Sequence, residues 1–135
     1  MAVQLSTAVR NAELDSIETT VGVSALLKLR TGAQPANCAA ADSGTVVSTI
    51  TLPVDWMNAA AAGAKTKLGV WEDTLADAAG TVAHWRLYES TGVTCHGQGT
   101  VTISGGGGDL TLDNNVVAIN QDVIVTSWTF TAGNP

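Results

Sequence analysis

The strongest constraint on the fold is a segment with the pattern of a single β-hairpin, residues 81–103 (TVAHWRLYESTGVTCHGQGTVTI). Apolar residues alternate with other residues along both arms, as in strands that have one buried face. Residues 90–92 (STG) supply a three-residue turn whose final glycine is free to adopt positive φ. A turn of this length places Trp85 opposite Gly97, where the indole can cover bare backbone. The hairpin therefore predicts a packed β core.

The other face of this hairpin is predicted to be polar and wet. It carries Val82, His84, Arg86 and Tyr88 on the first arm. In the predicted register His96 of the second arm lies diagonal to His84, about 7 to 8 Å away between backbones. Two imidazoles can share a metal ion, but no third ligand falls beside them. We therefore expect neither a metal nor a cofactor.

Further strands are predicted around the hairpin. They are residues 25–30, 45–52, 66–72, 110–112, 116–119 and 122–131. The last of these (DVIVTSWTFT) has apolar residues on both faces, which predicts a strand covered on both sides. Four glycines at 105–108 predict either a mobile connection or a sharp turn. About eight short strands separated by turn signals indicate a mainly β fold, an antiparallel β-sandwich of jelly-roll type.

The one convincing helical pattern lies in residues 3–21. Ser6 or Thr7 can cap its start, and Gly22 can end it. Its apolar stripe is thin, so the helix either packs along an edge of the β domain or serves as an arm that docks on a neighbouring subunit. The predicted division is an N-terminal helix or arm, residues 1–24, followed by a β-sandwich domain, residues 25–135.

Length, charge and the distribution of apolar residues limit the classes of partner that we expect. The chain has 135 residues, enough for one domain with its own core. Its net charge is −6, with only 6 Lys and Arg, so we expect no nucleic-acid partner, because phosphate binding needs clustered cations. We find neither an apolar run long enough to span a membrane nor a signal-peptide pattern, so we expect a protein made in the cytoplasm with no membrane partner.

The chain contains two cysteines, Cys38 and Cys95. Cys38 lies in a long irregular segment, residues 31–44 (TGAQPANCAAADSG), of the kind that often carries binding contacts. Cys95 is predicted to point inward. Without a CxxC motif or a histidine at metal spacing, zinc is not expected. Two interpretations stay open: two free thiols, or one disulfide between Cys38 and Cys95 that contributes roughly 4 kcal/mol in the chain-entropy model.

The sequence contains no pattern that predicts catalysis. GxSxG and HExxH motifs are absent, and Cys95 and His96 are predicted to point to opposite faces, so they do not form a dyad. The glycine run lacks the Lys and Ser or Thr of a phosphate loop. Asp109, Asp113 and Asn115 lack the spacing of a calcium-binding loop. We expect a protein that is not an enzyme.

Four segments resemble small structural proteins of tailed bacteriophages and prophages. They are QLSTAVRNAELDSIETTVG (4–22), LRTGAQPANCAAADSGTVVSTITLP (29–53), HWRLYESTGVTCHGQGTV (84–101) and GGGGDLTLDNNVVAINQDVIVTSWTFT (105–131). The resemblance covers nearly the whole chain, and it rests on an overall pattern and short phrases, not on a catalytic signature. It implies a virion component with a β-sandwich fold, and among such components a capsid decoration, or cement, protein that binds and stabilises the shell.

The resemblance also implies the partners and the location. The partners would be the major capsid protein and sister subunits in a homo-oligomer, on the capsid surface of the virion. The candidate contact residues are Leu5, Val9, Arg10, Leu14, Ile17, Gln34, Pro35 and Asn37. The alternative is a tail-tip or tail-fibre module that recognises host-surface carbohydrate by stacking Trp56, Trp71 or Tyr88 on a sugar ring.

Overall fold

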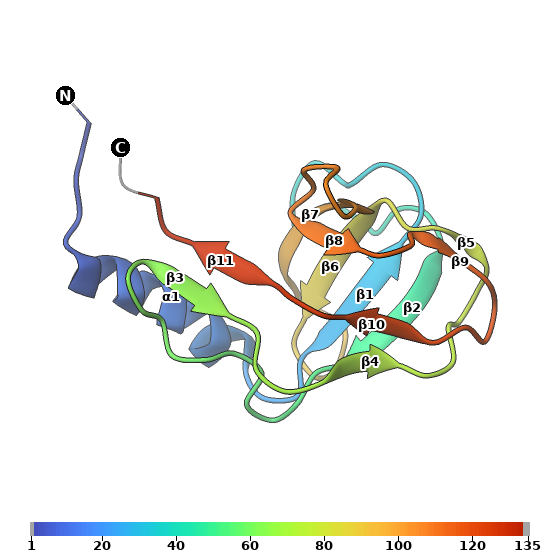
Figure 1. Ribbon diagram of the computed structural model, residues 1–135, viewed down its shortest axis with the longest axis horizontal. Coiled ribbons are helices and arrows are strands. Elements are labelled where there is room, and N and C mark those ends of the chain that lie inside the picture. Colours follow the sequence, from blue (N-terminus) through green and yellow to red (C-terminus); the bar gives the residue numbers. More distant parts are fainter. Residues whose placement is uncertain (1, 134–135) are drawn as a thin grey trace.

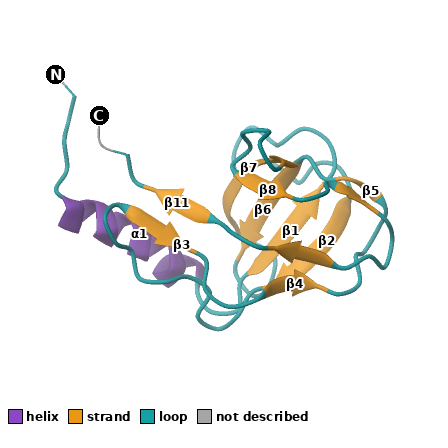
Figure 2. Cartoon of the chain, viewed as in Figure 1, coloured by secondary structure: helices purple, strands orange, loops and turns teal. Residues whose placement is uncertain are grey.

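The protein is mainly β, with one helix near its N-terminus, as the sequence predicted (Figure 2). This description covers residues 2–133 of the computed structural model. The elements are α1 (Thr7–Val21), β1 (Leu26–Arg30), β2 (Val46–Thr51), β3 (Ala64–Thr66), β4 (Trp71–Asp73), β5 (Gly80–Thr81), β6 (His84–Tyr88), β7 (Cys95–Ile103), β8 (Leu110–Leu112), β9 (Val116–Val117), β10 (Val123–Val125) and β11 (Thr129–Thr131).

Five strands form a curled sheet in the order β2-β1-β6-β7-β8. All neighbours are antiparallel except β7 and β8, which run parallel. A two-stranded ribbon of β4 and β10 lies across the open side of this sheet, where β4 packs against β2 and β10 against β8 (Figure 1). We call the curled sheet with this ribbon the half-barrel.

The parallel pair depends on the glycine run. Only residues 104–109 separate β7 from β8, so the chain must reverse sharply to bring β8 alongside in parallel. Gly105 and Gly107 have φ of 85° and 80°, and a Cβ on Gly106 or Gly108 would lie 2.7 or 2.9 Å from the nearest atom of Thr102. Of the two predictions for this run, the sharp turn is the one observed.

The central hairpin has a different register from the one predicted. Trp85 pairs with Gly99, Leu87 with Gly97 and Tyr88 with Cys95, with an irregularity after Leu87. The predicted three-residue turn is wrong because Glu89 organises a longer loop. Its carboxylate accepts hydrogen bonds from the backbone N–H groups of residues 93 and 94 at 2.9 and 2.6 Å. The backbone hydrogen bond to residue 94 is the main reason that the pKa of Glu89 falls to about 2.

The prediction that Trp85 covers glycine backbone holds, in a shifted form. A Cβ on Gly99 would lie 2.6 Å from Nε1 of Trp85, and a Cβ on Gly97 would lie 3.4 Å from its ring. Trp85 in turn meets Trp128 edge-on, with ring centroids 4.6 Å apart, and Trp128 meets Trp71 at 5.2 Å. These rings join the apolar face of the sheet, including Leu27, in one core.

A second part of the molecule projects from the half-barrel. Strands β3 and β11 pair antiparallel and lie beside α1, well away from the curled sheet (Figure 1). We call α1, β3 and β11 the lobe. As predicted, the helix is capped by Ser6, whose Oγ accepts from the Val9 N–H at 3.3 Å, and it ends at Gly22 with φ of 89°. The helix thus packs on its own chain.

Two predicted strands are each divided between these two parts. The predicted strand 66–72 becomes β3 in the lobe and β4 in the half-barrel, and 122–131 becomes β10 and β11. The prediction that 122–131 is covered on both faces is wrong, because Ile124 is 47% exposed. The chain crosses between the two parts at these points, and alternation of apolar residues alone does not reveal such a crossing.

Candidate functional site

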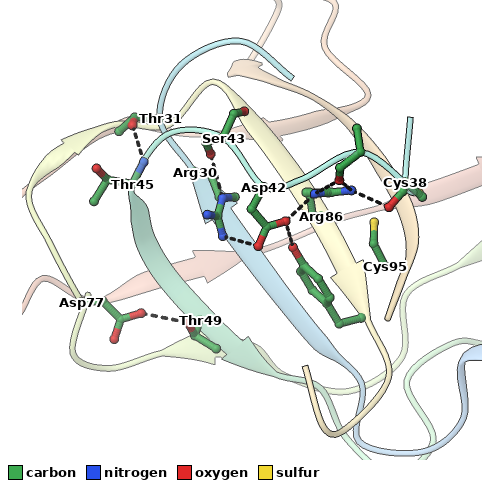
Figure 3. Close-up of polar contacts among 12 residues, drawn as sticks. Arg30, Thr31, Cys38, Asp42, Ser43, Thr45, Thr49, Asp77, Arg86 and Cys95 are labelled. Atoms are coloured by element: carbon green, nitrogen blue, oxygen red, sulfur yellow. Dashed lines mark hydrogen bonds and ion pairs between the residues drawn. The ribbon is translucent and has the colours of Figure 1, made fainter. Parts of the chain in front are cut away.

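The outer face of β6 is buried under a loop, not wet as predicted. His84, Arg86 and Tyr88 are at most 2% exposed. Residues 31–44, which connect β1 to β2, fold back over this face, and we call them the cover loop (Figure 3). Alternation placed His84, Arg86 and Tyr88 on this face correctly, but Val82, predicted on the same face, is 0% exposed and belongs to the apolar core. The burial of this face was not predicted because the loop that covers it is distant in the sequence.

Arg86 is the centre of the contact between the sheet and the cover loop. Its Nη2 donates to the carbonyl oxygens of Cys38 at 2.8 Å, Ala40 at 3.2 Å and Asn37 at 3.3 Å. Its Nη1 donates to the carbonyl of Ala40 at 3.2 Å and to the carboxylate of Asp42 (Figure 3). The planar guanidinium therefore fixes several points of the loop at once.

Asp42 supplies the carboxylate that the two arginines of the cluster share. Its carboxylate accepts from the Tyr88 hydroxyl at 2.5 Å and pairs with Nη1 of Arg30 at 3.4 Å, in addition to Arg86. Burial acts to raise the pKa of Asp42, but the hydrogen bond from Tyr88 and the charges of Arg30 and Arg86 outweigh it, so the pKa lies below its ordinary value. Burial, followed by the hydrogen bond to Asp42, raises the pKa of Tyr88.

Additional hydrogen bonds hold the edges of the cover loop. Nε of Arg30 donates to the Ser43 carbonyl at 2.9 Å, and Nε2 of Gln98 donates to the Pro35 carbonyl at 2.7 Å. Nδ1 of His84 lies 2.9 Å from the Gly32 carbonyl. Burial lowers the pKa of His84, so this imidazole is held in its neutral form with Nδ1 as the donor.

The two cysteines meet at the margin of this cluster. Cys38 and Cys95 are both free and half-buried, and they line the same pocket of about 290 Å³ together with Arg86. The prediction that Cys95 points inward is wrong, because the shifted register pairs it with Tyr88 on the outer face. Burial, and then contact with the Cys95 thiol, raises the pKa of Cys38 to about 11. The structure contains two free thiols that line one pocket, and the disulfide stays a prediction.

The two histidines are not brought together. His84 pairs with Thr100 under the cover loop, whereas His96 is exposed at the start of β7. Within residues 2–133, His, Cys, Asp and Glu side chains form no group of three that could hold a metal ion. What the Arg86 cluster does is hold two guanidinium groups against one carboxylate and the loop carbonyls, and so immobilise a loop whose far side faces outward.

The candidate contact residues of the N-terminal segment divide into two groups. Val9 is 45% exposed, and Leu5 is half-buried. Leu14 is 5% exposed and Ile17 packs against the core, so both face their own chain. Nη1 of Arg10 donates to the Ala132 carbonyl at 3.2 Å, which ties the helix to the end of β11.

The candidate contact residues of the cover loop remain near the surface. Gln34 and Asn37 are exposed and Pro35 is half-buried. Each of Pro35 and Asn37 uses its carbonyl to bind the sheet, through Gln98 and Arg86 respectively. The side chains of this loop thus stand on a backbone that the half-barrel holds in place.

Another buried cation, Lys65 in the lobe, was not identified from the sequence. It is 3% exposed, and its ammonium contacts Asp15 at 2.8 Å, Glu18 at 3.3 Å and the Asn58 carbonyl at 2.9 Å. Asp15 and Glu18 are three residues apart and share one face of α1, which was the available signal. Burial opposes the charge of Lys65, but the two carboxylates outweigh it and raise its pKa.

Comparison of the chain with protein-family models, curated proteins and solved structures finds no match. In the part of the chain that the structure describes, no helix has the length and apolarity needed to cross a membrane.

Proposed function

We propose that the chain is a structural protein of a tailed-phage virion, a capsid decoration or cement protein that binds and stabilises the shell. The observation that carries the proposal is the projecting lobe, which lies at the end of the molecule away from the half-barrel (Figure 1). Two apolar side chains are exposed there: Val9 on α1 is 45% exposed, and Val3, just before the helix, is 76% exposed. The resemblance of the sequence to phage structural proteins supports the same function.

The physical requirements of such a protein suit this architecture. A decoration protein gains affinity from weak contacts repeated over a lattice, because linked contacts act as a high effective concentration. The cover loop offers a second surface, already immobilised by Arg86, so little ordering entropy is lost on binding. We propose the major capsid protein and sister subunits as partners. The jelly-roll sandwich stays a prediction. It was predicted to be antiparallel, whereas β7 and β8 run parallel.

The three aromatic residues on which the carbohydrate-binding alternative depends are buried. Trp56 and Trp71 are 0% exposed and Tyr88 is 2% exposed. An aromatic ring must present a face to stack on a sugar, and these rings are covered by their own chain. We therefore do not propose a tail-fibre carbohydrate module.

Copy number in purified virions tests the proposed function. Gel densitometry against the major capsid protein should give hundreds of copies for a decoration protein, whereas a handful of copies would indicate a tail component and contradict the proposal. Particles lacking the protein should also disassemble at lower temperature.

A surface variant tests the role of the lobe. Changing Val3 and Val9 to Asp should lower occupancy on particles about tenfold, because each lost apolar contact is repeated across the lattice. Ile119→Asp is the matched control, since Ile119 is 61% exposed on the half-barrel, between β9 and β10. If the Val3 and Val9 variant, the Ile119→Asp control and the unchanged protein all show equal occupancy, the lobe does not contribute to binding.

A further inference from the structure

A groove separates the lobe from the half-barrel. It has a volume of about 540 Å³ and lies between Thr129–Thr131 of β11 and the residues Gly97 and Gln98 of β7. Its floor is aromatic: Trp128 packs edge-on to Trp85 at 4.6 Å and lies 4.9 Å from Phe130, ring centroid to ring centroid. The groove therefore has two walls made of strands and an apolar base.

The wall formed by β11 presents an unpaired strand edge. The backbone carbonyl of Trp128 accepts from the Lys67 N–H, and the backbone N–H of Ala132 donates to the Gly63 carbonyl, both at 3.0 Å. The backbone groups of Trp128 and Ala132 therefore point toward β3. Phe130 pairs with Lys65 in the same ladder. Because backbone groups alternate in direction along a strand, the N–H and C=O groups of Thr129 and Thr131 point away from β3, to the groove side.

The wall formed by β7 presents a second strand edge, which β8 leaves uncovered at Gln98. Val101 donates to the Ala83 carbonyl on the β6 side at 2.9 Å, whereas the N–H of Thr100 points the other way and donates to the Asp109 carboxylate at 2.9 Å. By the same alternation, the backbone of Gln98 faces the groove. Strand β8 pairs with β7 only at residues 101–103, so it leaves this stretch uncovered.

We propose that this groove binds an extended segment of a partner protein as an added β-strand. The inserted strand would hydrogen-bond to β7 on one side and to β11 on the other, and would join the curled sheet to the β3–β11 ribbon. Alternate side chains of the strand would rest on the floor formed by Trp85, Trp128 and Phe130. This mode of binding takes its affinity from backbone groups and its selectivity from every second side chain.

Charge selects the partner. Among the residues that line the groove, all of them described, Asp109 alone is charged. The chain has a net charge of −6, so charge disfavours a second copy of it in this acidic groove and favours a segment with Lys or Arg beside its apolar residues. The occupant is therefore a basic, extended segment of a different protein.

The test uses short synthetic peptides and the full chain. One peptide alternates threonine and valine and carries a lysine at each end; a second carries glutamates instead; a third is the lysine peptide with N-methylated backbone amides. Binding is followed by tryptophan fluorescence and by amide NMR shifts. The lysine peptide should bind about tenfold more tightly than either of the others, and it should shift the amides of Thr129, Thr131 and Gln98. Equal binding of all three peptides, or shifts elsewhere only, would overturn the proposal.

A pair of variants at one position tests the strand edge. Thr131→Pro removes an N–H directed to the groove and keeps the pairing with β3, because proline is accepted on a free edge. Thr131→Val keeps the N–H and is the control. Affinity for the lysine peptide should fall about tenfold in T131P and stay within about twofold in T131V. If T131P does not fold, the NMR shifts of the unchanged protein still decide the question.

Two further outcomes are decisive. In Asp109→Asn the preference for the lysine peptide over the glutamate peptide should shrink, because the groove loses its charged lining residue, and an undiminished preference would contradict the assigned charge selection. Sedimentation of the unchanged protein should give the same mass as T131P. A dimer that T131P converts to monomer would show that a second copy occupies the groove, and would overturn the proposed partner.

Discussion

Arg86 in the half-barrel and Lys65 in the lobe are both buried cations, but the two are held differently. Arg86 in the half-barrel binds one carboxylate, Asp42, and three backbone carbonyls of the cover loop. Lys65 in the lobe binds two carboxylates from the regular helix α1 and one carbonyl. The first cation orders an irregular segment, and the second anchors a segment that is already helical.

The difference follows from the side chains. A guanidinium presents donors in a rigid plane, so it can satisfy several carbonyls whose positions a loop must adopt together. An ammonium is a compact charge that accepts many geometries, and two carboxylates one turn apart on a helix suffice. We therefore expect loss of Arg86 to disorder the cover loop, and loss of Lys65 to loosen the contact between α1 and β3.

Arg86→Met should have the largest effect. It removes the donors of the Cys38 and Ala40 carbonyls and leaves Asp42 with Arg30 and Tyr88 alone, so the free energy of unfolding should fall by about 4 kcal/mol in a urea titration. Arg86→Lys keeps the charge and loses the planar fork, and should cost about half as much. If Arg86→Lys unfolds at the urea concentration of the unchanged protein, charge alone holds the loop and the comparison with Lys65 fails.

Oxidation should stabilise the half-barrel and leave the lobe unaffected. With oxidised glutathione, the Cys38 and Cys95 thiols lose two hydrogens to form one disulfide, and the glutathione disulfide is reduced to two thiols. The bond closes a long loop, so the free energy of unfolding should rise by about 4 kcal/mol. Because the pKa of Cys38 is about 11, the reaction should accelerate as pH rises.

Mass spectrometry and urea titration check the oxidation. The intact mass should fall by two hydrogens, and a Cys38→Ser variant under the same treatment should show neither the mass change nor the stabilisation. Persistent free thiols after prolonged oxidation at high pH would mean that the two sulfur atoms cannot reach bonding geometry.

Lys65→Met should have a smaller and more local effect. Asp15 is 45% exposed at its side chain, so water solvates part of the charge that remains, and we expect a cost of about 2 kcal/mol, between a surface and a buried ion pair. Amide hydrogen exchange should accelerate in α1 and stay unchanged in β6. Lys67→Met is the control, because Lys67 lies on the same side of the molecule and is only half-buried. Faster exchange in β6 would show that the two parts unfold together.

Local patterns in the sequence predicted those features that depend on near neighbours. Ser6 and Gly22 bound the helix as predicted, and alternation placed Trp85 and Leu87 in the core, because caps and strand faces depend on residues a few positions apart. The cover loop could not be predicted in the same way. Arg86 is covered by backbone carbonyls, and because every residue has a carbonyl, the sequence does not show which ones will bind the guanidinium. The one local signal for this contact is Asp42, the single charged residue in segment 31–44.

Features that depend on residues far apart in the sequence could not be predicted from the same local patterns. The register of the central hairpin depends on the Glu89 carboxylate, which organises the turn through backbone N–H groups and leaves no mark on the alternation. The Lys65 site required α1 and β3 to meet, and a period along one segment does not specify its neighbour. The free edges beside the groove likewise follow from the crossing of the chain between half-barrel and lobe.

The smallest expected effect is a pH dependence that belongs to the half-barrel. The pKa of His84 is lowered by burial, and Nε2 has no hydrogen-bond partner in the described residues, so a proton there would be buried without an acceptor. Below about pH 6.5 the unfolded chain therefore binds more protons than the folded one, and stability falls as pH decreases toward the folded-state pKa. Asp42 adds a loss of the same sign at more acidic pH, because its folded-state pKa also lies below the ordinary value.

Urea midpoints measured between about pH 7 and pH 5 should decline for the unchanged protein and decline less for His84→Gln. The pKa of Lys65 lies above its ordinary value and that of Asp15 lies below, so neither of these groups titrates in that interval. Hydrogen exchange in α1 should therefore change with pH only through the chemical exchange rate, and a pH-dependent opening of α1 would place the titrating group in the lobe instead.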